Sequence, residues 1–127
     1  MSLKIINTDK APAAVGPYSQ AIEAGDFVYI SGQIPLDPAT GKMVEGGVKE
    51  QTTRVLDNAM AILAEAGLTY KNVVKTTVLL KDMNEFATMN GVYADFFTDH
   101  KPARAAFEVA RLPLDVQVEI EMIAYKG

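Results

Sequence analysis

The sequence predicts an α+β protein with one β-sheet and two helices packed on the same face of that sheet. Three observations lead to this fold class. Strand-like segments stand at both ends of the chain, two segments carry apolar residues at helical spacing, and one β-branched segment separates those two. The order is therefore hairpin, helix, strand, helix and two further strands. We expect a single domain over residues 1–127, since the chain has neither an internal repeat nor a linker-like tract.

The first part of the chain is predicted to contain short strands separated by loops. Gly25 and Asp26 stand between two strand-like runs, and this spacing is typical of a tight hairpin turn. Prolines and glycines in the flanking segments predict loops, and the later loop is long enough to fold back as a small hairpin. The expected elements are, in order, a strand over 3–7, a loop over 11–17, strands over 18–24 and 27–33, and a loop over 34–47.

The middle of the chain predicts two helices with a strand between them. From Val48 to Ala66 apolar residues recur at spacings of three and four, and Gly67 is a typical residue to end a helix. The segment from Val73 to Leu80 is rich in β-branched residues and is predicted to be a strand. Asp82, with an acidic residue three positions on, is typical of a helix start and predicts a second helix from Met83 to Thr98.

The segment from Pro102 to Tyr125 is predicted to form two strands joined by a short turn. In the second strand apolar residues alternate with others, which sends the two sets to opposite faces of the sheet. If the apolar sets of both strands share one core, Arg104 and Glu119 lie together on the other face. Such a pair fits a site that holds an anion and handles a proton, and it equally fits an exposed ion pair of small energy.

The sheet face turned away from the helices is predicted to be too apolar for a monomer. Apolar residues of several strands cannot all point into one helical layer, namely Val28, Ile30, Ile34, Leu79 and Ile123. A mixed apolar and charged sheet face is typical of a subunit interface. We therefore expect an oligomer, in which residues from two subunits can line one site.

The composition excludes several classes of function. The chain has no cysteine and a single histidine, which argues against a tightly bound zinc or iron centre. A net charge of −4 argues against non-specific binding to nucleic acid, which depends on a basic surface. No apolar run approaches the roughly 18 residues of a membrane span, and the first ten residues lack the apolar stretch of a secretion signal. We expect a cytoplasmic protein with neither a metal nor a cofactor. An organelle is the open alternative, because a mature chain would have lost its transit peptide.

Several short motifs, taken in order along the chain, resemble those of one protein family. They are APAAVGPYSQ at 11–20, SGQIP at 31–35, VKTTV at 74–78, FATMN at 86–90, PAR at 102–104, VARLP at 109–113 and VEIE at 118–121. A short piece such as SGQIP carries little weight alone, but the set spans nearly the whole chain in the family's order. On these motifs the chain resembles the Rid family, the reactive intermediate deaminases, and within it the RidA-type enamine/imine deaminases.

The resemblance implies a chorismate-mutase-like fold, a homotrimer and three clefts between neighbouring subunits. It also implies hydrolysis of 2-iminobutanoate and 2-iminopropanoate, or of their enamine tautomers, to 2-oxo acids and ammonia, without a cofactor. By position in the family motifs, Arg104 binds the substrate carboxylate and Glu119 is the family's site glutamate. The residues that the resemblance implies as the cleft lining are Tyr18, Ser31, Gly32 and Asn90.

The implied chemistry suits these residue types. An imino acid carries a carboxylate beside an electrophilic C=N bond, and the planar guanidinium of Arg104 matches a carboxylate with two parallel hydrogen bonds. Because the iminium carbon is already reactive, catalysis needs only a positioned water and a proton acceptor, which is the role expected for Glu119. Glu121 lies on the same strand face, so the choice between the two glutamates stays open. Many family members carry a cysteine where this chain has Ala106, and a thiol-based regulation is therefore not expected.

Two other functions fit parts of the same sequence. An arginine-lined cleft also suits a non-catalytic regulatory protein that binds a small carboxylate. Some relatives have been assigned endoribonuclease activity or inhibition of translation, but the acidic charge and the single His100 argue against both. Each site residue also has a purely structural explanation, such as packing of Tyr18 on Pro17, a bulge at Ser31 and Gly32, or an ordinary amide hydrogen bond at Asn90.

Overall fold

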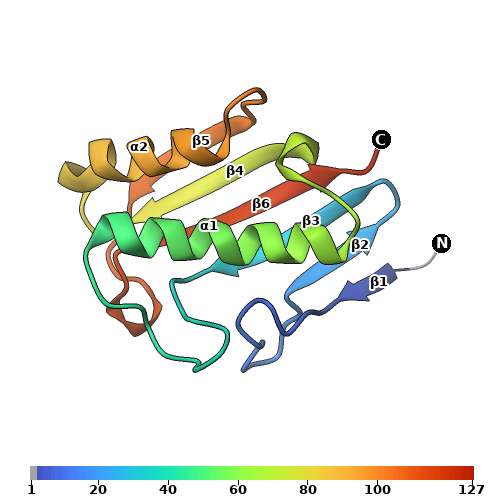
Figure 1. Ribbon diagram of the computed structural model, residues 1–127, viewed down its shortest axis with the longest axis horizontal. Helices are drawn as coiled ribbons and strands as arrows, with labels where there is room; N and C mark the ends of the chain where they lie inside the picture. Colours follow the sequence, from blue (N-terminus) through green and yellow to red (C-terminus); the bar gives the residue numbers. More distant parts are fainter. Residues whose placement is uncertain (1–2) are drawn as a thin grey trace.

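A computed structural model describes residues 3–127, which form one six-stranded sheet with two α-helices on one of its faces (Figure 1). The sheet has the strand order β1-β2-β3-β6-β4-β5. The strands are β1 (Leu3–Ile6), β2 (Ala21–Ala24), β3 (Phe27–Gln33), β4 (Val73–Leu80), β5 (Ala103–Glu108) and β6 (Val118–Tyr125). The helices are α1 (Val48–Glu65) and α2 (Phe86–Phe96). The predicted α+β class and the placement of both helices on one face are confirmed.

The N-terminal hairpin forms where the turn residues predicted it. β2 and β3 pair in antiparallel fashion, with Ala24 opposite Phe27 across the turn. Gly25 has a φ of +60°, a conformation that glycine adopts without strain. The long loop that follows β3 folds back once, through a single bridge between Leu36 and Met43. The predicted small hairpin in this loop is therefore present in minimal form.

α1 has the predicted boundaries to within one residue, and its apolar stripe is the centre of the core. The stripe residues that are completely buried are Val55, Leu56, Ala59, Ile62 and Leu63. Gly67 has a φ of +78°, and the N–H of Leu68 donates to the carbonyl of Leu63 at 2.8 Å. This bond uses a carbonyl that the helix end would otherwise leave without a partner.

α2 is shorter than the predicted segment from Met83 to Thr98. Asp82 does act as a cap, but its carboxylate accepts from the N–H of Asn84 and starts a 3₁₀ turn over Met83–Glu85 instead of the α-helix. At the other end Phe97 leaves helical geometry with a ψ of 79° and is buried. The helix therefore ends where Phe97 enters the core.

The C-terminal strands do not form the predicted hairpin. β5 pairs in parallel with β4, and β6 pairs in antiparallel fashion with both β4 and β3, so that β4 separates β5 from β6 (Figure 1). The connection between β5 and β6 contains a 3₁₀ turn, η3 (Pro113–Asp115), and is longer than a hairpin loop. The prediction failed because α2 carries the chain back over the sheet, which makes a parallel strand the next one after β4.

This pairing turns Arg104 and Glu119 to opposite faces of the sheet. Arg104 stands opposite Thr76, which is fully buried under the helices, so its side chain points to the helix face. Glu119 stands opposite Leu79, whose side chain points to the other face, called the open face below. The prediction that both share one face is wrong, because the apolar set of β5 does not face the helices. Instead, Ala106, whose side chain points to the same face of β5 as that of Arg104, packs against the core.

The open face carries large apolar side chains at its surface. Those exposed by more than a third are Leu3, Ile5, Phe27, Tyr29, Phe107 and Tyr125. Of the residues that were predicted not to share one helical layer, Val28 and Ile30 are buried under the helices, while Leu79 and Ile123 lie on the open face. An apolar face of this kind is what the expected subunit interface requires, and the interface itself stays a prediction.

Candidate functional site

Arg104 lies in a cleft between α2 and the start of β5. Its Nη1 donates to Oδ1 of Asn90 at 2.7 Å. Its guanidinium carbon lies 4.7 Å from the ring centroid of Tyr93 and 5.4 Å from that of Phe86. The cleft has a volume of about 430 Å³, and its lining residues are Asn90, Tyr93, Ala94, Phe97, Lys101, Pro102 and Arg104. We call it the Arg104 cleft.

The fold holds the ring of Tyr93 beneath the guanidinium. The hydroxyl of Tyr93 lies 2.7 Å from Oγ1 of Thr76, a buried residue of β4. Burial raises the pKa of Tyr93, while the hydrogen bond between Tyr93 and Thr76 and the charge of Arg104 act in the opposite direction. The phenol therefore stays neutral, and its ring offers a face to the cation.

The guanidinium of Arg104 has no carboxylate partner among the described residues. The ion pairs within residues 3–127 join Lys81 to Asp115 and Lys126 to Glu23. With Asn90 as a neutral acceptor, most of the five guanidinium N–H groups remain available. An exposed cation held in a fixed position by a neutral amide and aromatic rings is suited to bind an anion.

A second cleft gathers four of the other predicted site residues. Its volume is about 570 Å³. Its lining residues are Pro12, Ala13, Val15, Tyr18, Gln20, Ser31, Gly32, Gln33, Ile34, Leu36, Pro113, Leu114 and Glu119. We call it the Glu119 cleft. It brings together Tyr18, Ser31, Gly32 and Glu119, and it has no residue in common with the Arg104 cleft.

The shape of the Glu119 cleft comes from an irregularity in β3. The pairing of β3 with β6 shifts between Ile30 and Gln33, which forms a bulge at Ser31 and Gly32. A Cβ on Gly32 would lie 2.9 Å from Cδ of Glu119, so a side chain there would force the Glu119 carboxylate to move. The absence of a side chain at Gly32 therefore leaves the space that the Glu119 carboxylate occupies.

Ser31 and Gln20 fix the loop that carries Tyr18. The hydroxyl of Ser31 donates to the carbonyl of Ser19 at 2.6 Å, and its N–H donates to the carbonyl of Gln20 at 3.0 Å. The buried amide of Gln20 donates to the carbonyls of Thr8, Ala11 and Pro12. The hydroxyl of Ser31 thus already has a structural partner, and Tyr18 is half-exposed beside Glu119.

The two glutamates of β6 have different surroundings. Burial raises the pKa of the Glu119 carboxyl, and the nearby charge of Glu121 raises it further. Glu119 lines the cleft, whereas Glu121 is exposed and lines neither of the two clefts. The geometry therefore favours Glu119 as the carboxylate that meets a ligand.

The predicted site residues thus form two separate groups in one chain. Arg104 and Asn90 lie together on the helix side, and Tyr18, Ser31, Gly32 and Glu119 lie together in the other cleft. Tyr93 and Phe86 were not predicted as supports for Arg104. A signal was present, because Phe86, Asn90 and Tyr93 are spaced at i, i+4 and i+7 and share one helix face. No group of His, Cys, Asp and Glu side chains within residues 3–127 is arranged to hold a metal ion.

Comparisons with known proteins agree with this fold. Residues 8–126 match the protein family described as endoribonuclease L-PSP. A RutC family protein of Pyrococcus abyssi is 57% identical over 126 residues, which cover 99% of each chain. The 2-iminobutanoate/2-iminopropanoate deaminase of Mus musculus is 54% identical over 124 residues, covering 98% of this chain and 92% of the mouse protein. The crystal structure of E. coli TdcF with bound serine has a TM-score of 0.93 at 46% identity, covering 98% of this chain and 99% of TdcF.

The protein is of the class of small α+β domains. It has a single sheet with two helices on one face, and one cleft lies on each side of the sheet. Within that class, the chain belongs to the endoribonuclease L-PSP family, which is also called the YjgF/Rid family. The resemblance drawn from the sequence motifs is confirmed. None of the helices formed by residues 3–127 has the length and apolar character needed to cross a membrane.

Proposed function

We propose that this protein hydrolyses 2-imino acids, or their enamine tautomers, to 2-oxo acids and ammonia, with 2-iminobutanoate and 2-iminopropanoate as substrates. The observation that carries the proposal is Arg104, an exposed guanidinium held in a cleft without a carboxylate partner among residues 3–127. The mouse relative is named for this activity, and the serine bound to TdcF is also a small carboxylate. Both names support the proposal.

In this proposal Arg104 binds the substrate carboxylate. Asn90 accepts from Nη1, and the remaining N–H groups include a pair that can donate two parallel hydrogen bonds to a carboxylate. The ring of Tyr93 limits the conformations of the guanidinium before substrate arrives, which lowers the entropy lost on binding. Binding through both oxygens also orients the C=N bond next to the carboxylate.

Glu119 then positions the attacking water and transfers protons. Water adds to the carbon of the protonated imine and gives a proton to the Glu119 carboxylate. That proton passes to the amino group, which leaves as ammonia and takes up the hydroxyl proton as the C=O bond forms. Because burial raises the pKa of Glu119, the carboxyl is better suited to accept and return a proton than an exposed glutamate.

The complete site is proposed to form between two copies of the chain. In one chain the side chains of Arg104 and Glu119 point to opposite faces of the sheet, so a water held by one cannot reach a substrate held by the other. A homotrimer supplies Arg104 from one subunit and Glu119 from its neighbour at each of three equivalent interfaces. The exposed apolar side chains of the open face support this association. The proposal places the oligomer in the cytoplasm, and the lack of cysteine fits a reducing compartment.

A trapping assay tests the activity. Threonine dehydratase acting on L-threonine releases 2-iminobutanoate, and semicarbazide converts the imine into a semicarbazone that absorbs light. The protein should lower semicarbazone formation in proportion to its concentration, and Arg104→Ala should not. A folded wild-type protein that leaves trapping unchanged would refute the proposal and leave ligand binding as the function of the Arg104 cleft.

RNA cleavage is the second candidate, because the matching family is described as endoribonuclease L-PSP. The single histidine of the chain, His100, is half-buried with Nε2 2.6 Å from the carbonyl oxygen of Val73, which engages one ring nitrogen. A net charge of −4 also disfavours RNA. Incubation of a labelled single-stranded RNA with wild type and with Arg104→Ala distinguishes the candidates. Cleavage by wild type alone would favour the nuclease.

A further inference from the structure

Leu114 has a backbone conformation that leucine rarely adopts. Its φ is 55° and its ψ is 19°, in the left-handed region, and the next residue, Asp115, also has a positive φ of 57°. Aspartate is among the residues that tolerate a positive φ, but leucine in this region is strained, and strained residues are frequent where a side chain must reach a functional position. The Leu114 side chain is 65% exposed and lines the Glu119 cleft.

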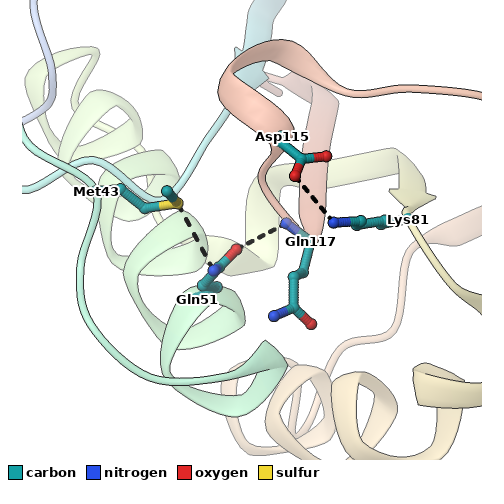
Figure 2. A network of polar contacts seen from close by, with 5 residues as sticks. All are labelled: Met43, Gln51, Lys81, Asp115 and Gln117. Carbon is teal, nitrogen blue, oxygen red and sulfur yellow. Dashed lines mark hydrogen bonds and ion pairs between the residues drawn. The ribbon is translucent and has the colours of Figure 1, made fainter.

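Two polar contacts hold the chain at the end of the η3 turn and just after it (Figure 2). Nζ of Lys81 donates to Oδ2 of Asp115 at 3.1 Å. The side-chain oxygen of Gln51, a buried residue of α1, accepts from the N–H of Gln117 at 2.8 Å, and its amide nitrogen lies 3.7 Å from the sulfur of Met43. Because these contacts fix the chain just after Leu114, the leucine is held at the cleft instead of turning into the core.

The Glu119 cleft is larger and more apolar than a short imino acid requires. Much of its wall is apolar and includes the side chains of Val15, Ile34, Leu36, Pro113 and Leu114. Its volume of about 570 Å³ would leave much of the space to water if the ligand carried only one or two side-chain carbons. Val15 and Leu114, which are 87% and 65% exposed, come from separate loops and offer apolar surface to a longer alkyl group.

We propose that Leu114 determines substrate specificity by contacting the alkyl side chain of the imino acid, and that the protein favours branched aliphatic imino acids over 2-iminopropanoate. This inference rests on the proposed function and names the substrate class of the same site. Each methylene group that a hydrophobic pocket accepts or rejects changes selectivity by about 10- to 200-fold. A leucine-derived imine, with its branched alkyl chain, should therefore gain the most from an apolar wall.

The test compares two imines in the same trapping assay. An L-amino-acid oxidase converts L-leucine or L-alanine to the matching 2-imino acid with reduction of O₂ to H₂O₂, and catalase removes the peroxide. The readout is the protein concentration that halves semicarbazone formation from each imine, expressed as a leucine-to-alanine preference. Four variants are compared with wild type. Leu114→Asn keeps the branching and number of side-chain heavy atoms, tolerates a positive φ and removes the apolar surface, whereas Leu114→Met keeps that surface. The other two are Leu114→Ala and the control Val74→Ala.

Val74 is a suitable control because it is an exposed aliphatic residue near the start of β4 and lines neither cleft. We expect wild type to prefer the leucine-derived imine, and Leu114→Asn and Leu114→Ala to lose about 10-fold of that preference. Leu114→Met and Val74→Ala should retain it. If both imines are hydrolysed and Leu114→Asn keeps the wild-type preference, or if wild type prefers the alanine-derived imine, the specificity inference is wrong while the proposed function stands. If wild type hydrolyses neither imine, the proposed function fails and the inference fails with it.

Discussion

Arg104 and Glu119 lie on opposite faces of one sheet. Arg104 is aligned with Thr76, under the helices, and Glu119 with Leu79, on the open face. A guanidinium that binds the substrate carboxylate and a glutamate that positions water must meet at one substrate. The geometry of the single chain therefore makes the proposed hydrolysis a property of an assembly of chains.

Mixing two inactive variants should restore activity. Arg104→Ala and Glu119→Ala each destroy one half of every site when they form their own oligomers. In a mixed trimer, an interface that takes Arg104 from one variant and Glu119 from the other is intact. Random assembly of equal amounts gives about a quarter of the interfaces this composition. Trapping activity after co-refolding should therefore reach about a quarter of that of wild type.

The controls for the mixing experiment are the two variants refolded separately and then combined without exchange of subunits. They should stay inactive. Size-exclusion chromatography with light scattering measures whether the wild type is a trimer. Absence of complementation in mixed oligomers would mean that one chain carries the whole site, and it would contradict the shared interface.

Arg104→Lys should lose most of the activity although it keeps the charge. Lysine cannot donate two parallel hydrogen bonds, and it cannot stack on Tyr93 as a planar group. A hydrogen bond to a charged group contributes about 1.5–3 kcal/mol, so kcat/KM should fall by about 10- to 150-fold. Asn90→Ala removes the 2.7 Å contact to Nη1 and should raise KM more than it lowers kcat. Steady-state kinetics on the trapped imine measures both effects.

Element types were predictable from this sequence because the responsible patterns are local. The apolar spacing from Val48 onward predicted α1 to within one residue, and Gly25 with Asp26 predicted the hairpin. The position of Arg104 was not predictable in this way, since alternation shows only that two sets of side chains face apart. The set of β5 that faces the core is decided by the strand order, in which β4 lies between β5 and β6. This order depends on pairing between segments that are far apart in the chain.

The candidate site was predictable to a similar degree. The motif resemblance supplied its residues, but it did not show that they divide between two clefts. Alternation places Glu119 and Glu121 on one face, so the choice of Glu119 rested on the motif resemblance alone. Only the bulge at Gly32, which leaves room for one carboxylate, distinguishes the two.

Gly32→Ala should abolish activity with little effect on stability. The added methyl group would collide with the carboxyl group of Glu119, with a Cβ–Cδ separation of 2.9 Å. Glutamate is flexible, so its carboxylate can turn away at small energetic cost, but it then leaves the position that holds the water. We expect a melting temperature close to that of wild type and a loss of activity similar to that of Glu119→Ala.

The matched control for Gly32→Ala is Gly91→Ala in α2. A Cβ at Gly91 meets nothing within 4 Å, and alanine in a helix is favoured over glycine by about 0.5–1 kcal/mol. This variant should be slightly more stable and fully active. If Gly32→Ala unfolds at a much lower temperature, the collision involves rigid structure and the interpretation of Glu119 as a movable side chain is wrong.

The raised pKa of Glu119 predicts how stability and activity depend on pH. Burial and the charge of Glu121 favour the protonated form in the folded chain, so folding binds protons between the ordinary pKa of 4.5 and the higher folded value. The stabilising effect of this carboxyl is complete below pH 4.5 and is lost as the pH rises through the folded pKa. Glu119→Gln, which imitates the protonated form, should therefore be more stable than wild type at pH 7 and equal to it at pH 4. Chemical denaturation at both pH values measures the difference.

Glu121→Gln tests the same interaction through catalysis. Removing the charge of Glu121 takes away the second cause of the raised pKa, so the pKa of Glu119 should fall while burial still holds it above its ordinary value. Since a proton acceptor must be ionised, kcat/KM decreases at low pH, and in Glu121→Gln this decrease should begin at a lower pH than in wild type. The maximum rate should change little, because Glu121 lines neither cleft. An unchanged pH profile together with a large loss of rate would instead assign the functional carboxylate to Glu121.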